Sequence, residues 1–172
     1  MGSRNLLIVG AGSYAVVAYE IAKSMLCFEN IAFVDDSKAV TPNGLQVIGT
    51  IADILSLSDE FSDVIVAIGN SDIRLDLIKQ IRAYCKLSLC TLISPDAYVA
   101  DSSDVGAGTI IEPMAVISSL SKIGEGCIIS TGAVIGHDCV CGNGVHVDFN
   151  ATVTPYSTVP AKTKVNCGSV YC

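Results

Sequence analysis

The second half of the chain carries an apolar residue at every sixth position, a spacing that neither a helix nor an ordinary strand produces. These positions run without a gap: Val99, Val105, Ile111, Ile117, Ile123, Ile129, Ile135, Cys141, Val147, Val153, Val159 and Val165. Two residues before each of them stands a small or modest side chain: Ala97, Ser103, Thr109, Ala115, Ser121, Cys127, Ala133, Cys139, Val145, Ala151, Ser157 and Thr163. A gapless sixfold repeat predicts a parallel β-helix in which each hexad forms one short strand and its corner. Three hexads close a coil, so we expect residues 18 apart to stack and residues 97–172 to form about four coils around one apolar core.

The first part of the chain alternates between strand and helix patterns. A continuous apolar run at residues 6–9 predicts a buried parallel strand, and the Gly-rich turn 10–15 follows it. Apolar residues then recur at helical spacing before a second predicted strand at residues 31–34. A further strand at residues 64–68 precedes a helix that Asn70 or Ser71 can cap, and residues 87–92 are expected to form the last strand before the repeat begins at residue 94.

These patterns predict an α/β fold combined with a β-solenoid: a small Rossmann-like domain over residues 1–93, followed by the parallel β-helix over residues 94–172. Three segments lie just past the carboxyl ends of the predicted strands, the edge of an open α/β sheet where ligands bind. They contain Gly12, Ser13 and Tyr14, then Asp35 and Asp36, and finally Gly69 and Asn70. Turn chemistry accounts for each segment taken alone. Their convergence on one edge favours a ligand site.

The composition restricts the possible binding partners of the protein and its cellular compartment. The formal net charge of −7 argues against nucleic acid as a partner, because phosphate binding requires a broad basic face. Hydrophobic residues make up 51% of the chain, but no apolar run reaches the roughly 18 residues that a membrane-spanning helix needs. No signal peptide pattern opens the chain, so we expect a cytoplasmic protein with no membrane contact. The eight cysteines are then expected to be thiols.

The repeat contains both histidines of the protein, His137 and His146. His137 falls two residues after a core position, at a corner where side chains point outward, and Asp138 follows it as a carboxylate able to orient an imidazole. A solvated surface histidine is the simpler alternative. A metal site made of His137, Cys139 and Cys141 is disfavoured, because the two cysteines belong to the inward ladders and the histidine does not.

The order of these features resembles the sugar O-acyltransferases of the sialic acid type, a group that includes N-acetyltransferases of UDP- or GDP-linked amino sugars. The likeness rests on the Gly-rich turn, on residues 33–36 and 67–74, on the hexapeptide ladder and on residues 134–139, and it covers nearly the whole chain. It implies a left-handed β-helix, a homotrimer with active sites between subunits, and acetyl-CoA as the donor. No metal is expected. It also implies that the N-terminal domain holds a nucleotide sugar or amino sugar.

The resemblance implies roles for single residues as well. His137 would be the general base, Asp138 the carboxylate behind it, and His146 and Cys167 contacts of the acetyl-CoA. The substrate contacts that it implies are Gly12, Ser13, Tyr14, Asp35, Asp36, Gly69 and Asn70. The expected reaction is direct acetyl transfer to an amine or hydroxyl of the sugar in a ternary complex, because no residue is placed to serve as a covalent nucleophile.

Three departures from the family pattern bear on this expectation. The first turn has Ser13-Tyr14-Ala15 where the family usually has Gly-His-Gly, so one substrate contact must differ. Pro155 stands one coil above His137, where the family offers a glycine whose N–H faces the thioester carbonyl, and proline has no N–H. In the family, further coils follow the position that Cys172 occupies here, and these coils help to hold the coenzyme.

Two other functions therefore stay open. A trimeric binding or regulatory protein that keeps the nucleotide-sugar pocket but has lost transfer is favoured by Pro155. An NAD-dependent oxidoreductase rests only on the glycine turn, whose third glycine is replaced by Ala15.

Overall fold

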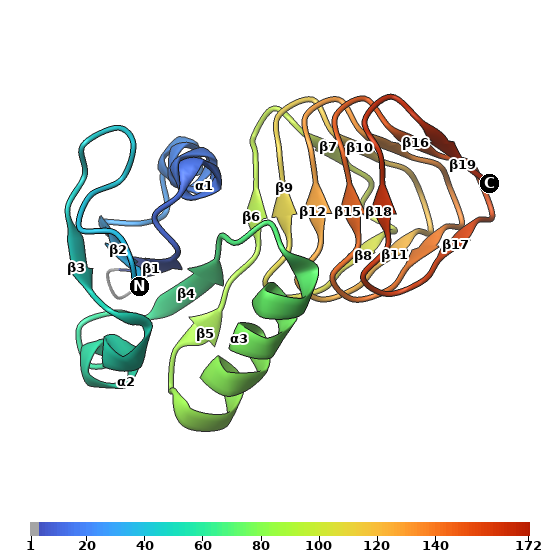
Figure 1. The fold of residues 1–172 in the computed structure, drawn as a ribbon. Helices are drawn as coiled ribbons and strands as arrows, with labels where there is room; N and C mark the ends of the chain where they lie inside the picture. The colour runs from blue at the N-terminus through green and yellow to red at the C-terminus, as the bar shows by residue number, and fades with distance from the viewer. Residues whose placement is uncertain (1–3) are drawn as a thin grey trace. The chain divides into compact units, whose positions relative to one another are not determined.

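The computed structural model describes residues 4–172, which form two compact units that divide between Cys90 and Thr91. Figure 1 shows an α/β unit followed by a coiled stack of short strands. Each unit is built around an apolar core of its own. Within residues 4–172, no helix combines the length and the apolar character needed to cross a membrane.

The first unit contains a parallel five-stranded sheet in the order β3-β2-β1-β4-β5. The strands are β1 (Asn5–Val9), β2 (Asn30–Val34), β3 (Val47–Gly49), β4 (Asp63–Val66) and β5 (Ser88–Leu89). After β3 the chain returns to the other side of β1, so strand order reverses between β1 and β4, as it does in Rossmann-like sheets. The predicted fold class of this unit is thereby confirmed.

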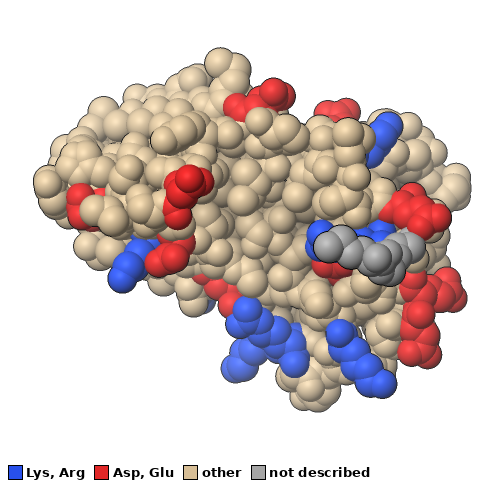
Figure 2. All heavy atoms as spheres, turned by 180° about the vertical axis from the view of Figure 1, so that it is seen from behind, with Lys and Arg blue, Asp and Glu red and all other residues tan. Residues whose placement is uncertain are grey.

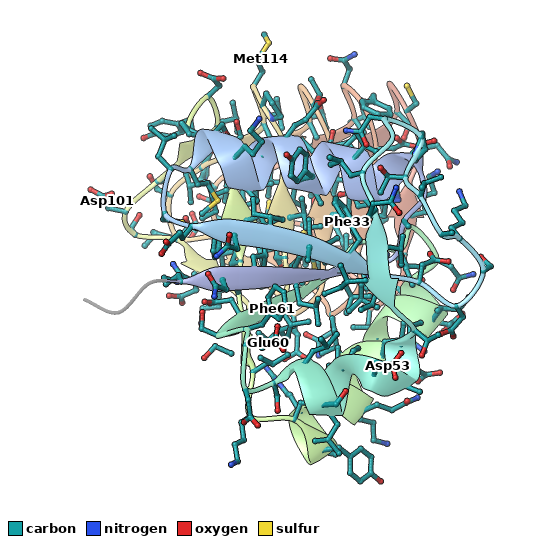
Figure 3. All side chains as sticks on the ribbon, turned by 90° about the vertical axis from the view of Figure 1, so that its left-hand side faces the viewer. Phe33, Asp53, Glu60, Phe61, Asp101 and Met114 are labelled. Atoms are coloured by element: carbon teal, nitrogen blue, oxygen red, sulfur yellow. The ribbon has the colours of Figure 1, made fainter. Side chains whose placement is uncertain are left out.

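Helices cover both faces of this sheet (Figure 1). Helix α1 (Ser13–Ser24) lies on one face, whereas α2 (Ile54–Leu57), which continues the short 3-10 helix η1 (Ile51–Asp53), and α3 (Ser71–Tyr84) lie on the other. Side chains alternate along β1, so Leu7 and Val9 join the core beneath α3. On the α1 face, Phe33 of β2 is buried against the ring of Tyr19, with 5.6 Å between the ring centroids (Figure 3).

The second unit is a parallel β-helix made of two-residue strands. They are β6 (Leu92–Ile93), β7 (Tyr98–Val99), β8 (Asp104–Val105), β9 (Ile110–Ile111), β10 (Val116–Ile117), β11 (Lys122–Ile123), β12 (Ile128–Ile129), β13 (Val134–Ile135), β14 (Val140–Cys141), β15 (His146–Val147), β16 (Thr152–Val153), β17 (Thr158–Val159), β18 (Lys164–Val165) and β19 (Val170–Tyr171). They form three sheets, ordered β18-β15-β12-β9-β6, β19-β16-β13-β10-β7 and β17-β14-β11-β8. One strand from each sheet makes up one coil.

Every strand pair of the β-helix joins residues that are 18 apart. Val105, Ile123, Cys141 and Val159 form the internal column that this register predicts, and the other two sheets repeat it. The second residue of each strand points inward, so Ile117, Ile135 and Val153 are fully buried. The sixfold pattern therefore predicted both the coil and its core.

The corners of the coils repeat as regularly as the strands. A residue with a left-handed backbone recurs every six residues: Gly108, Met114, Leu120, Gly126, Gly132, Asp138, Gly144, Asn150, Tyr156, Lys162 and Gly168. Glycine, asparagine and aspartate tolerate this conformation, whereas other side chains are disfavoured in it. The corner geometry thus imposes a positive φ even where the residue is Met114, Leu120, Tyr156 or Lys162.

The predicted strand over residues 87–92 is wrong. It divides into β5, which pairs with β4, and β6, which pairs with β9 of the next coil. The apolar run continues across this region, so the sequence pattern does not show the boundary between β5 and β6. Ile93 lies six residues before Val99, so the ladder of the repeat extends one hexad further towards the N-terminus than was predicted.

Candidate functional site

His137 occupies a corner of the β-helix just after β13. Gly136, between the strand and the histidine, lets the next coil approach closely, because a Cβ there would lie 2.7 Å from the nitrogen of Pro155. Ile135 is buried in the core, whereas the His137 side chain is 47% exposed. The histidine therefore projects outward, as its place in the repeat predicts.

Asp138 binds His137 directly. The Asp138 Oδ2 atom lies 2.8 Å from His137 Nδ1. Asp138 has a φ of 57°, a left-handed conformation that aspartate tolerates, and its N–H donates to the carbonyl of Ser119 in the coil below. The tautomer with its proton on Nδ1 donates to the carboxylate, which leaves the Nε2 lone pair to accept a proton.

Two residues of the next coil cover this corner. The N–H of Tyr156 donates to the carbonyl of His137 at 3.1 Å. The Tyr156 ring stands edge-on to the imidazole, at an interplanar angle of 88° with 5.0 Å between the ring centroids. Pro155 has no N–H, and the next N–H along the chain, that of Tyr156, already donates to the carbonyl of His137. Tyr156 was not predicted as a site residue, although its position 18 residues after Asp138 gave a signal.

His146 lies on another sheet of the β-helix, in β15. Its Nε2 lies 3.2 Å from Ser130 Oγ, one coil below, and 3.9 Å from Asp148 Oδ1. Lys164 Nζ lies 2.8 Å from the other oxygen of Asp148, and the hydrogen bond from Lys164 lowers the pKa of that carboxyl. Ser130, Asp148 and Lys164 are a polar group around His146 that the sequence analysis did not identify.

The cysteines comprise buried, partly buried and exposed thiols. All eight are thiols, and Cys167, the predicted coenzyme contact, is exposed along with Cys172. Burial raises the pKa of the Cys141 thiol to about 12, and Cys139 is shifted in the same direction for the same reason. In the part of the chain that the structure describes, no group of three or more histidine, cysteine or acidic side chains is arranged to hold a metal ion.

In the first unit, the predicted loops meet at the carboxyl edge of the sheet. Gly10 has a φ of 108°, and a Cβ there would lie 3.1 Å from the carbonyl oxygen of Ala67, so the turn after β1 packs closely against the end of β4. The N–H of Ala11 donates to Asp35 Oδ2 at 2.8 Å. These contacts join the loops that follow β1, β2 and β4 at the point where strand order reverses.

The two aspartates of this edge are already hydrogen-bonded within the unit. Asp35 Oδ1 accepts from the N–H and hydroxyl of Ser37 and from the N–H of Lys38. Partial burial raises the pKa of Asp35, but its hydrogen bonds from Ser37, Ala11 and Lys38 outweigh this effect, so the pKa lies below its usual value. Asp36 Oδ1 accepts from the N–H of Ile51 at the start of η1. Both carboxylates thus fix loop geometry.

The other predicted substrate contacts lie at helix starts. Gly12 is the N-cap of α1 and makes no side-chain cap, and Ser13 and Tyr14 form its first turn. The ammonium of Lys38, which the sequence analysis did not identify, lies 3.9 Å from where a Cβ of Gly12 would stand. Asn70 caps α3 by accepting from the N–H of Ile73 at 3.1 Å, as predicted for Asn70 or Ser71. The exposed Gly69 precedes it.

The structure brings the predicted site residues together in two groups. One consists of the loops at the carboxyl edge of the first unit, and the other is the His137–Asp138 pair. His146 belongs to a different sheet from β13, and Cys167 lies past the end of β18. On the face that Figure 2 shows, acidic and basic side chains occur in small separate groups, and most of the surface carries neither.

Comparison with known proteins assigns the chain to a family. Residues 5–81 match the family described as the PglD N-terminal domain. The acetyltransferase domain of PglB from Neisseria gonorrhoeae, solved with acetyl coenzyme A, is 31% identical, with a TM-score of 0.80; the match covers 98% of this chain and 88% of that one. No curated protein matches the chain in a sequence comparison.

A second solved relative is a mutant of perosamine N-acetyltransferase from Caulobacter crescentus, in complex with CoA and GDP-perosamine. It is 29% identical, with a TM-score of 0.85, and the match again covers 98% of this chain and 88% of that one. WeeI from Acinetobacter baumannii, at 20% identity and a TM-score of 0.74, shares the fold. The solenoid of the present chain is thereby confirmed as a left-handed β-helix. The chain belongs to the family of sugar acetyltransferases that join a PglD-type N-terminal domain to this β-helix.

Proposed function

We propose that the protein transfers the acetyl group of acetyl-CoA to an amine or hydroxyl of a nucleotide-linked sugar, with His137 as the general base. One observation carries this proposal: the 2.8 Å contact between His137 Nδ1 and Asp138 Oδ2 at an exposed corner. The fold requires neither side chain. The contact prepares the opposite ring nitrogen, Nε2, to take a proton.

The reaction follows from this pair. The acceptor nitrogen or oxygen attacks the thioester carbonyl carbon, the new bond to carbon forms, and the carbon–sulfur bond breaks. His137 Nε2 removes the proton from the attacking atom, and Asp138 stabilises the imidazolium that results. That proton then passes to the departing thiolate, which leaves CoA as the free thiol. The solved complex of perosamine N-acetyltransferase supports an amine as the acceptor.

The first unit would hold the nucleotide sugar at its carboxyl edge. Asp35 and Asp36 fix the loops there, and their free lone pairs remain as acceptors. Gly12 to Tyr14 present the start of α1 next to Lys38, which suits an anionic group. Gly69 and Asn70 would complete this substrate site. The GDP-perosamine complex of the relative supports a nucleotide amino sugar.

Of the proposed acetyl-CoA contacts, His146 lies on a different sheet from β13, and Cys167 lies past the end of β18. A homotrimer would resolve this separation, because one subunit could contribute His137 and its neighbour could contribute His146. The sheet that contains β13 supports an assembly of this kind: its outward side chains are mainly apolar, namely Tyr98, Val116, Val134, Thr152 and Val170.

The test measures release of free thiol from acetyl-CoA with a panel of UDP- and GDP-linked amino sugars. Loss of the base in His137→Ala is expected to reduce the rate by about a hundredfold to ten thousandfold. Asp138→Asn should give an intermediate rate, because the imidazole remains but is less well oriented. Hydroxylamine treatment of the product separates the acceptors, since it cleaves an ester and leaves an amide intact. Wild-type turnover that survives in His137→Ala would overturn the assignment of the base.

Pro155 favours one alternative function, a trimeric nucleotide-sugar-binding protein without transfer activity. It offers no N–H to a thioester oxyanion, and the neighbouring N–H of Tyr156 already donates to His137. Loss of one oxyanion donor lowers kcat by a factor of about 10² to 10³. A protein that binds the nucleotide sugar in calorimetry but never releases thiol would establish this alternative.

A further inference from the structure

Tyr156 is the one aromatic ring in contact with His137 among the described ring pairs, and the turn geometry does not explain its presence. Its φ of 65° is the left-handed conformation that this corner imposes in every hexad. Glycine, asparagine or aspartate would adopt that conformation at lower cost. The side chain is 75% exposed, so it adds little to the core.

The geometry of the imidazole shows what Tyr156 can contribute. His137 and Asp138 are both substantially exposed, at 47% and 37%, and a hydrogen bond between side chains in such a setting adds little free energy. A single hydrogen bond at Nδ1 constrains one ring atom and does not by itself fix both side-chain torsion angles of His137. The edge-to-face contact with Tyr156, with 5.0 Å between the centroids, lies in the range where aromatic rings attract each other. The carboxylate fixes one ring atom, and the tyrosine fixes the plane.

We propose that Tyr156 is a positioning residue for His137: its ring holds the imidazole plane so that Nε2 points at the acceptor while Nδ1 stays on Asp138. This inference rests on the proposed function. This role belongs to the ring and gives the Tyr156 hydroxyl no part in proton transfer, which Tyr156→Phe tests. The N–H bond from Tyr156 to the His137 carbonyl is a backbone contact that any residue at this corner would keep.

The chain offers a matched control for the backbone strain. Met114 also follows a proline, also has a left-handed backbone with a φ of 61°, and its N–H also donates to the carbonyl of a residue one coil below, Asp96. It is 70% exposed and lies at a different corner, where Figure 3 shows it projecting from the molecule. Tyr156→Gly and Met114→Gly therefore relieve the same strain, but only the first removes a ring from His137.

The experiment compares wild type with Tyr156→Gly, Tyr156→Phe and Met114→Gly in the full chain. We expect kcat for acetyl transfer to fall about tenfold to a hundredfold in Tyr156→Gly, the size of effect that misplacement of a reacting group produces. KM should stay near the wild-type value. Tyr156→Phe should restore kcat, and Met114→Gly should match wild type. Both glycine variants should melt at or above the wild-type temperature, which separates lost activity from lost folding.

A nuclear magnetic resonance measurement tests the contact without activity. The protein has two histidines, so its spectrum contains two histidine Hε1 signals, and His137→Ala identifies one of them. The Tyr156 ring current should displace the His137 signal in wild type and in Tyr156→Phe but not in Tyr156→Gly, while the His146 signal stays fixed. The proposal is overturned if the wild type is active and Tyr156→Gly has the same kcat. It is also overturned if the His137 signal has the same chemical shift in wild type and in Tyr156→Gly. An inert wild type with the displaced signal overturns the proposed function instead.

Discussion

At the scale of single residues, Asp35 orders the carboxyl edge of the sheet before any ligand binds. Its two oxygens accept hydrogen bonds from the turn after β1 and from the loop after β2. These bonds lower the pKa of the carboxyl against the opposing effect of burial. A residue expected to contact the substrate therefore also determines the local fold, and its replacement affects both.

We expect Asp35→Asn to lower the thermal unfolding midpoint at pH 7. Asparagine has one acceptor oxygen, and its amide nitrogen would face an N–H donor. Because the native pKa is lowered, the stabilisation by the carboxylate is fully present above the unfolded pKa of about 3.9 and disappears as the pH falls through the native value. The difference from wild type should thus shrink below about pH 4. Exposed Asp59→Asn is the control, and a constant difference at all pH values would contradict this account.

Residues that adjoin in sequence were easier to predict than residues that meet across coils. His137 and Asp138 are consecutive, so their contact follows from local geometry alone. Tyr156 contacts His137 only because the coil has 18 residues, and the same register places Ser130 beneath Asp148. The 18-residue register predicted the stacking of the core positions and the place of Pro155 above His137. The corner positions were not treated as a ladder, although they repeat with the same period.

At the scale of elements, a column of glycines allows successive coils to stack at one corner. A Cβ on Gly124 would lie 2.7 Å from the Asn143 nitrogen and 2.7 Å from the carbonyl carbon of Gly142, and Gly142 is close to Ala161 in the same way. Hydroxyl groups connect the coils at neighbouring positions. Thr109 Oγ1 donates to the carbonyl of Gly124 and accepts from the N–H of Cys127. The small residues of the repeat therefore satisfy backbone groups as well as filling space.

Gly124→Ala is expected to destabilise the protein by about 1–3 kcal/mol, the usual effect of forcing an extra carbon into packed structure. The backbone of the coil above must shift, since no flexible side chain alone can give way. Urea unfolding measures the loss. Gly69→Ala serves as the control, because a Cβ at that position meets nothing within 4 Å. Equal stability of the two variants would show that the coils are less closely stacked than described.

The fold was predictable to the extent that its elements repeat. The hexads fixed the strands, the core column and the length of the coil, because every hexad supplies the same evidence again. The short strand β3 was missed, since three residues at a sheet edge leave almost no pattern. The boundary between β5 and β6 was misplaced, because an apolar run looks the same on either side of it.

At the scale of the whole molecule, the proposed homotrimer requires one face of the β-helix to be covered. The outward positions on the sheet of β13 are mainly apolar, and Tyr98 and Val170 there are 62% and 64% exposed. The sheet of β14 instead presents Asp104, Lys122, Val140 and Thr158. Subunits are therefore expected to meet on the β13 sheet, with the His137 corner at its edge.

Val134→Lys, on the β13 sheet, is expected to dissociate the trimer, because a buried lysine without a partner opposes association. Val140→Lys makes the same change on the β14 sheet and should leave the assembly intact. Sedimentation of both variants at micromolar concentration distinguishes them. A monomeric wild type, or a trimer that Val134→Lys does not disturb, would remove the basis for placing His137 and His146 in one site.

The 18-residue register also restricts how this molecule can change in length. Insertion of a whole coil of 18 residues leaves every later residue on the same sheet or at the same corner. Each later side chain also keeps its inward or outward direction. Insertion of a single residue rotates everything after it, so that core side chains face water and the corners lose their left-handed residues. We therefore expect natural or engineered length variants of this β-helix to differ by complete turns. A coil added between His137 and Tyr156 would preserve the fold but separate the ring from the base.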